Sequence, residues 1–171
     1  MSYTIRPLAE EDLINLTDIF SSAIGHIDDS IYTKTQKEAW IHGAPQDAHD
    51  WKLRLEGLKT LVACESLDCK DQGHEDGPKS RAVAFLSFKE TGYIDLLYVH
   101  PDHQRQGLAT SLLALVKADC LARGQQYLSA HVSHAARPFF ERQDFEIKEH
   151  CVQVRNGVKI ENAWMMSKMK A

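Results

Sequence analysis

The amino-acid sequence predicts an α/β fold in one domain that spans residues 1–171. Segments with the apolar spacing of helices alternate along the chain with segments that have the apolar pattern of strands. The 171 residues, 43% of them apolar, are enough to form one sizeable core but too few to favour two separate cores. Neither an internal repeat nor a linker-like stretch divides the chain. We therefore expect a single compact domain.

The first third of the chain predicts one strand and three helical segments. Residues Tyr3–Arg6 alternate before Pro7 and predict a short strand. From Glu10 to Gly25 the apolar residues recur at helical spacing. Two weaker helical segments follow at Gln36–His42 and Asp47–Leu58.

The middle of the chain predicts three strands. Thr60–Cys64 and Arg81–Phe88 form two of them, and the polar residues 66–79 between them predict a turn. The third, Tyr93–Val99, is apolar on both faces except at Asp95. A strand of this kind is expected in the buried centre of a sheet.

The last third predicts a long helix, a strand, a short helix and a hairpin. In order, these elements are Leu108–Arg123, Tyr127–Ser133, Ala135–Arg142, Phe145–Arg155 and Val158–Lys168. The pair Asn156-Gly157 separates the last two segments and favours a tight hairpin turn.

Composition excludes several classes of protein. The formal net charge of −4 argues against a nucleic-acid partner, which normally requires a basic face. No apolar run is long enough for a signal peptide or a membrane span, so we expect a cytoplasmic protein without a membrane partner.

No metal site is expected. The four cysteines lack the paired spacing of a zinc site and predict reduced thiols. The nine histidines include no pair with the helix-face spacing of a metal hydrolase, which disfavours that rival function. An acidic turn is better explained as a solvated hairpin tip than as a metal loop. That turn contains Cys69, Asp71, His74, Glu75 and Asp76.

The segment with the strongest functional signal joins the buried strand to the long helix. A helix start offers unpaired backbone N–H groups and the positive end of the helix dipole, which suit a pyrophosphate. Gly107 and Ala109 would let a phosphate approach the backbone closely, and Arg105 could add a charged contact. From spacing alone, an ordinary strand-to-helix turn explains the segment equally well.

Two longer motifs resemble a known family. Gln104–Ala109 matches the cofactor motif Arg/Gln-x-x-Gly-x-Gly/Ala of the GNAT (Gcn5-related N-acetyltransferase) superfamily, and Val99–Pro101 matches the strand end before it. Ser133–Phe145 resembles the family's second motif, Asn-x-x-Ala-x-x-Phe-Tyr-Glu-Lys-x-Gly-Phe. With the order of elements between them, the resemblance covers nearly the whole chain.

This resemblance implies a GNAT-like domain with a mixed, mostly antiparallel central sheet, splayed fourth and fifth strands, and helices on both faces. The fourth strand is Tyr93–Val99 and the fifth Tyr127–Ser133, with the pantetheine arm of acetyl-CoA between them. The implied cofactor-binding residues are Leu97, Val99, Gln104, Arg105, Gln106, Gly107, Leu108, Ala109, Thr110, Ser133 and Ala136. Ser133 replaces the family's Asn and has a shorter reach.

The implied function is transfer of the acetyl group of acetyl-CoA, as a cosubstrate, to a primary amine of a small molecule or protein by direct attack. Asp95 is our candidate for the base, and the alternative is an ion pair with a core arginine. Phe140 occupies the place of the family's usual acid, a Tyr. Tyr98 or Ser133 could supply the proton, or the thiolate could leave unaided. A third alternative is an inactive acetyl-CoA-binding module.

Other aromatic and histidine residues receive weaker assignments. His131 shares a strand face with Ser133 but is better explained as a partly exposed sheet histidine. Trp40, Trp51 and Tyr32 lie in the segment that covers the acceptor site in the family, and helix packing is the alternative for both tryptophans. We expect His100 and His103 to be solvated. The C-terminal hairpin could supply a homodimer edge.

Overall fold

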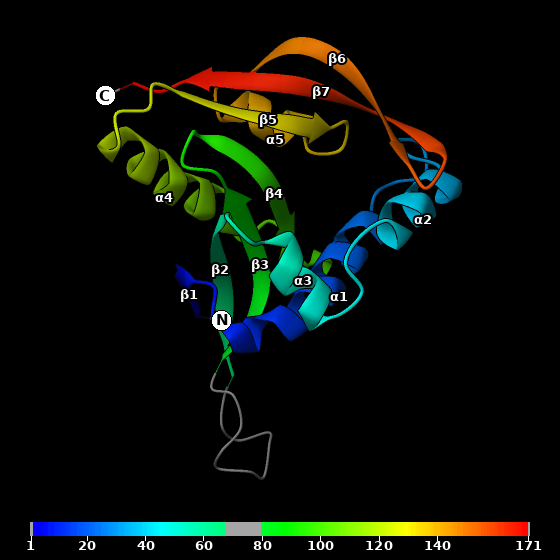
Figure 1. The fold of residues 1–171 in the computed structure, drawn as a ribbon, viewed down its shortest axis with the longest axis horizontal. Coiled ribbons are helices and arrows are strands. Elements are labelled where there is room, and N and C mark those ends of the chain that lie inside the picture. The colour runs from blue at the N-terminus through cyan, green and yellow to red at the C-terminus, as the bar shows by residue number, and fades with distance from the viewer. Residues whose placement is uncertain (1, 68–79, 171) are drawn as a thin grey trace.

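The computed structural model describes residues 2–67 and 80–170. Its strands form one sheet in the order β1-β2-β3-β4-β5-β7-β6 (Figure 1). The strands are β1 (Tyr3–Pro7), β2 (Lys59–Ser66), β3 (Ser80–Phe88), β4 (Tyr93–Val99), β5 (Tyr127–Ser133), β6 (Glu146–Arg155) and β7 (Val158–Lys168). All neighbours are antiparallel except β4 and β5, which run parallel. The acidic turn considered as a metal loop, Cys69 to Asp76, lies outside the described residues.

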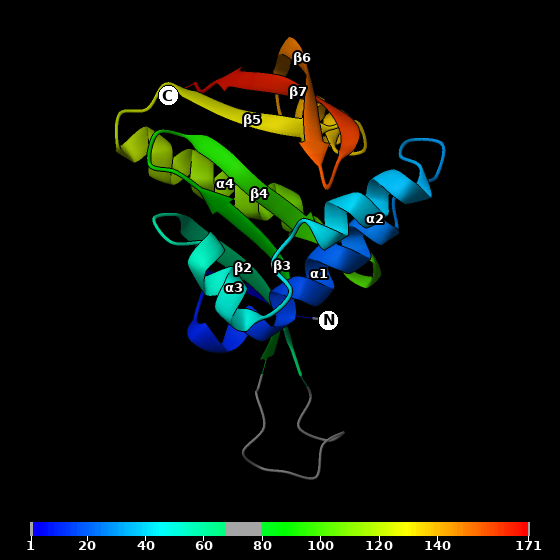
Figure 2. The same ribbon diagram turned by 45° about the vertical axis from the view of Figure 1, so that its right-hand side comes forward.

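Helices cover both faces of the sheet, as expected. They are α1 (Leu13–Gly25), α2 (Lys34–His42), α3 (Ala48–Arg54), α4 (Leu108–Ala122) and α5 (Arg137–Arg142), with 3-10 turns at Glu10–Asp12 and Pro101–His103. The helices α1 and α3 pack on one face of β2–β4 and α4 packs on the other (Figure 2). None of the helices in the described ranges is long and apolar enough to cross a membrane.

Each face of the sheet has its own apolar core, because successive side chains of a strand point to opposite sides. In β4, Leu97 and Val99 pack toward α4, whereas Leu96 and Tyr98 pack toward α1 and α3. Both faces of β4 are therefore covered, which explains its almost continuous apolar sequence.

The strands β4 and β5 separate soon after they begin. Their register contains only two pairs, Tyr93 with Ser129 and Ile94 with Ala130. Figure 2 shows the two strands diverging beyond this point. The splayed fourth and fifth strands implied by the family resemblance are thus confirmed.

The C-terminal hairpin has the tight turn that its sequence predicts. Asn156 and Gly157 adopt φ values of 49° and 77°, the left-handed conformation that Asn and Gly tolerate best. The strand β6 forms the edge of the sheet, and its Val152 and Val154 are exposed. The homodimer edge stays a prediction.

Candidate active site

A cavity of about 490 Å³ lies where β4 and β5 diverge, and it reaches the loop before α4. All the site residues predicted from the sequence line it, except Gln106, which is exposed and outside its wall. The fold therefore brings together residues from the two separate motifs.

The backbone of β4 is arranged so that Leu97 and Val99 face the gap. His100 N–H donates to the carbonyl of Val83 at 2.9 Å, which makes these two residues a hydrogen-bonded pair. Because such pairs alternate along an antiparallel ladder, Tyr98 bonds to β3 and the polar groups of Leu97 and Val99 point away from it. These groups are directed toward the splay.

A β-bulge at Asp95 interrupts the regular alternation of side chains along β4. Ser87 pairs with Leu96 and Phe88 with Ile94, which leaves Asp95 as the extra residue. A bulge re-aims side chains, and here it directs Asp95 toward α3, where its Oδ2 lies 2.6 Å from Arg54 Nη2. The carboxylate lacks a well-aligned hydrogen bond at that oxygen, so the contact is an ion pair.

The loop before α4 presents a row of free amides. Arg105 and Gly107 have φ values of 62° and 76°, and this left-handed geometry turns the loop into the helix start. The first helical bond runs from Ser111 N–H to the Gly107 carbonyl. Within the described part of the chain, the N–H groups of residues 105–110 have no hydrogen-bond partner. Such a set of donors at a helix N-terminus can bind a phosphate group.

Two hydrogen bonds, one from Gln104 and one at His103, hold the loop before α4 in place. Gln104 Nε2 donates to the carbonyl of Val99 at 3.2 Å and ties the loop to the end of β4. His103 is 4% exposed, and its Nδ1 lies 3.0 Å from the hydroxyl of Tyr3. The expectation that His103 is solvated was wrong, because a 3-10 turn folds its ring inward against β1. His100 is partly buried, and its Nδ1 accepts from Asp102 N–H.

The second motif closes the far side of the cavity. Ser133 Oγ accepts from Ala136 N–H at 3.1 Å, which stabilises the turn into α5 and leaves the hydroxyl proton available. Phe140 is buried between Phe139 and Phe145 in edge-to-face contacts. The place of the family's Tyr therefore holds an apolar ring without a proton to give.

Tyr98 is a phenol on β4 that lines both cavities. Burial holds its pKa well above the ordinary value of about 10, and the charge of Arg155 and a hydrogen bond from Trp40 oppose that rise. A phenol of this kind stays protonated and serves as a hydrogen-bond donor. Its proton is held too tightly for full transfer to a thiolate of ordinary basicity.

A second cavity of about 170 Å³ lies on the α1–α3 side of the splay. Its wall includes Tyr32, Trp40 and Trp51 and residues of β5, β6 and β7. Trp51 also packs in the core, where its indole donates to Thr17 Oγ1 at 2.9 Å. The packing role of Trp51 is therefore observed, and the role of this aromatic segment in covering an acceptor site stays a prediction.

His131 lies on the wall of both cavities. Its Nδ1 is 3.2 Å from the hydroxyl of Tyr93, and its ring lies against Trp164 with centroids 4.7 Å apart. Burial raises the pKa of Tyr93, with the charge of Asp95 as the next cause. The ring is exposed but is held in place by two aromatic neighbours.

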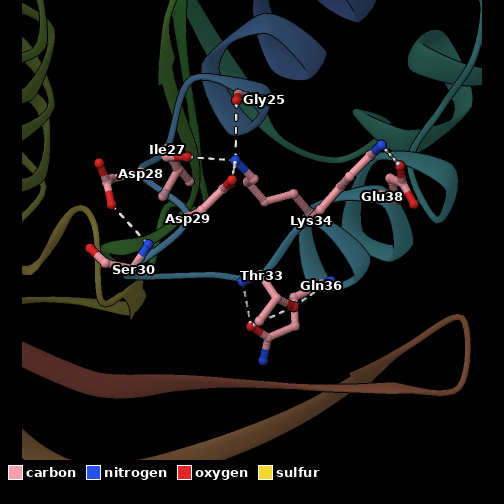
Figure 3. A network of polar contacts seen from close by, with 10 residues as sticks. Gly25, Ile27, Asp28, Asp29, Ser30, Thr33, Lys34, Gln36 and Glu38 are labelled. Atoms are coloured by element: carbon pink, nitrogen blue, oxygen red, sulfur yellow. Dashed lines mark hydrogen bonds and ion pairs between the residues drawn. The ribbon is translucent and has the colours of Figure 1, made fainter.

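A polar network fixes the α1–α2 connection that carries Tyr32. Figure 3 shows the carbonyls of Gly25 and Ile27 and the carboxylate of Asp29 around one ammonium. That ammonium belongs to Lys37, with distances of 3.4, 2.6 and 2.6 Å respectively. The Lys37 side chain thus holds the α1–α2 connection in place.

The start of α2 is anchored to β7 as well. Thr33 and Gln36 form a capping box (Figure 3), and Gln36 Nε2 also donates to the carbonyl of Lys159. The Tyr32 hydroxyl donates to the carbonyl of Glu161 at 2.6 Å and accepts from His134 N–H. Tyr32 and the start of α2 are therefore hydrogen-bonded to β7, which also lines the second cavity.

Sequence reasoning missed three members of this second cavity. Arg54 lies on α3, Arg155 ends β6, and Asn162 lies on β7 opposite Ser133. The hairpin register, which the Asn156-Gly157 turn sets, could have placed the last two on neighbouring strands, but the pairing of β7 with β5 has no local signal in the sequence. Among the described residues, no cluster of His, Cys, Asp and Glu could hold a metal ion.

Comparisons with known proteins find a family model and relatives that match this chain. A family model described as an acetyltransferase (GNAT) domain matches residues 75–164. The uncharacterized N-acetyltransferase YafP of Escherichia coli (strain K12) is 30% identical over 165 residues, which are 96% of this chain and 95% of that protein.

Solved structures share the fold. A GCN5-related N-acetyltransferase (aminotransferase, class-II) from Rhodopseudomonas palustris is 30% identical with a TM-score of 0.82, covering 99% of this chain and 97% of that one. The PaiA N-acetyltransferase of Thermoplasma acidophilum, solved in complex with coenzyme A, is 18% identical with a TM-score of 0.69, covering 99% and 100%. The second likeness is one of fold alone.

Proposed function

The chain belongs to the GNAT acetyltransferase family, and from that premise we propose that it moves the acetyl group of acetyl-CoA to a primary amine by direct attack. The observation that carries this proposal is the amide-lined loop at residues 105–110, which opens onto the splay between β4 and β5.

The diphosphate of acetyl-CoA fits the start of α4. The free N–H groups of residues 105–110 and the positive end of the helix dipole attract two negative charges. Gly107 has no neighbouring atom within 4 Å of the position that a Cβ would take, so its backbone is open to a ligand. Arg105 is exposed beside it and adds a cation.

The pantetheine arm then follows the splay. The backbone groups of Leu97 and the N–H of Val99 that point away from β3 can pair with its amides, whereas the Val99 carbonyl already accepts from Gln104 Nε2. A backbone N–H directed at the thioester oxygen stabilises the charge that develops there during attack. Tyr98 contributes a second, protonated donor from the same strand.

The amine approaches from the second cavity. Several residues line both cavities and define where they meet: Trp40, Asp95, Leu96, Tyr98, His131 and Ser133. At that meeting point the amine nitrogen bonds to the acetyl carbon, the carbon–sulfur bond breaks, and an amide and a free thiol result. Asp95, whose side chain is 17% exposed, attracts the ammonium and accepts its proton before attack.

Free-thiol release from acetyl-CoA in the presence of a panel of primary amines tests this function. We expect amine-dependent thiol release, with an acetylated amine identified by mass spectrometry. A specific observation, the buried Phe140, favours a second function as an acetyl-CoA-binding module without turnover. That alternative predicts a rise of Tm with acetyl-CoA and no thiol release with any amine.

A further inference from the structure

The second cavity carries a surplus of positive charge, although the chain has a formal net charge of −4. Its charged wall residues, apart from histidine, are Arg54, Arg155 and Asp95. Arg54 is paired with Asp95, so Arg155 supplies the surplus. A pocket for a purely cationic amine would be expected to carry the opposite sign.

Arg155 is an exposed residue that lines the cavity. Its Nη2 donates to Gln153 Oε1 at 3.0 Å, and no carboxylate in the described part of the chain pairs with it. Its charge is felt at the phenols of both Tyr93 and Tyr98, where it lowers the pKa against the effect of burial. A guanidinium without an acidic partner is suited to bind a carboxylate with two parallel hydrogen bonds.

An unpaired acceptor lies deeper in the same cavity. Asn162 is 8% exposed, and its Oδ1 has no hydrogen-bond partner among the described residues. A buried amide oxygen without a donor is destabilising, and an ammonium or amine N–H would satisfy it. Asn162 lies opposite Ser133, which is one of the residues shared by the two cavities. An amine held there is next to the thioester.

The spacing of the two features suits one small ligand. Gln153, which holds the Arg155 guanidinium, lies opposite Ile160, two residues from Asn162 on β7. At about 3.3 Å per residue, the backbones at Ile160 and Asn162 are about 7 Å apart. Arg155 and Asn162 thus line one cavity from neighbouring strands, which suits a small ligand with a carboxylate at one end and an amine at the other. A volume of about 170 Å³ is suited to a small acceptor.

We propose that the acceptor is a small free amino acid, held by Asn162 and Asp95 at its amine and by Arg155 at its carboxylate. This inference rests on the proposed acetyl transfer and names its substrate class. The amine nitrogen bonds to the acetyl carbon, the thiol of coenzyme A leaves with a proton, and the carboxylate is unchanged. The product is an N-acetylamino acid.

The test compares free amino acids with their carboxamides in the thiol-release assay. A carboxamide keeps the side chain and the amine but loses the negative charge, and its less basic amine is neutral more often. Any preference for the free acid must therefore come from the binding site. We expect kcat/KM to be at least about tenfold higher for the best amino acid than for its carboxamide.

Two variants locate the source of that preference. In Arg155→Gln the ratio between acid and carboxamide should fall to near one. Lys159→Gln is the matched control, because it removes the same charge from the same hairpin but on the opposite face of β7 from Ile160. Its ratio should equal that of the parent chain.

The outcomes separate this inference from the function on which it rests. Thiol release that is as fast with carboxamides or simple amines as with amino acids would overturn the acceptor class and leave acetyl transfer intact. An unchanged ratio in Arg155→Gln would overturn the role of that residue. Absence of thiol release with every amine would instead overturn the proposed function itself.

Discussion

Gly107 offers the clearest test of the diphosphate site, because one substitution there separates backbone strain from charge. Its φ of 76° is unfavourable for residues with a Cβ, which raises the free energy of the folded state by about 1–2 kcal/mol. No atom lies within 4 Å of the position that a Cβ would take, so Gly107→Gln adds strain without a clash. Gly107→Glu adds the same strain together with a negative charge.

The charge has a calculable effect on binding. A carboxylate about 6 Å from one charge of the diphosphate, in surroundings with an effective dielectric constant of about 20 to 60, opposes binding by about 1–3 kcal/mol. We therefore expect Gly107→Glu to bind coenzyme A about 5- to 150-fold more weakly than Gly107→Gln. Isothermal titration calorimetry at two salt concentrations measures this ratio, which should shrink at high salt.

Gly124 provides the matched control at the other end of α4. Its φ is 80°, and nothing lies within 4 Å of a Cβ there either. Gly124→Gln and Gly124→Glu should lower Tm by a few degrees through strain, and their affinities for coenzyme A should be equal. If Gly107→Glu and Gly107→Gln also bound coenzyme A equally well, the placement of the diphosphate at this helix start would be refuted.

Three further predictions follow from the site. Asp95→Asn should lower kcat about 100-fold in the thiol-release assay, with coenzyme A affinity within about twofold, and an unaltered kcat would remove Asp95 from the chemistry. Tyr98→Phe should lower kcat about tenfold. Burial raises the folded-state pKa of Tyr98 above its unfolded value of about 10, so its stabilising effect is present below pH 10 and lost as the pH rises. The free energy of unfolding should therefore fall less steeply above pH 10 in Tyr98→Phe than in the parent chain, and equal slopes would contradict this reasoning. Lys37→Ala should lower the free energy of unfolding by about 2–3 kcal/mol, because it leaves two carbonyls without a buried ammonium donor. Lys34→Ala, which removes an exposed pair with Glu38 on the same helix, should change it by less than about 0.5 kcal/mol, and similar losses in urea titrations would show that the network is not anchored by Lys37.

Local patterns in the sequence were enough to predict most elements of the fold. The bounds of β4, β5 and β7 agree with the predicted segments, because apolar runs and turn residues mark strand ends directly. The third helix ends at Arg54 rather than Leu58, since residues there form a turn that brings the chain into β2. The 3-10 turn at Pro101–His103 was not predicted, because three residues carry no periodicity.

The loop that we propose for the diphosphate could be located from the sequence, because its donors are backbone groups within a contiguous motif. The residues of the second cavity could not. Arg54, Arg155 and Asn162 come from three elements that meet only through tertiary packing, and no local pattern marks them. The Asp95 bulge likewise depends on pairing with β3, so the ion pair with Arg54 could be named only as an alternative.

Amide hydrogen exchange in the presence and absence of coenzyme A tests the central claim most directly. The N–H groups of residues 105–110 have no partner in the described structure, so they should exchange rapidly in the free chain. Coenzyme A should slow these amides, together with those of Leu97 and Val99 that face the splay. Equal exchange rates at residues 105–110 with saturating coenzyme A would contradict the account.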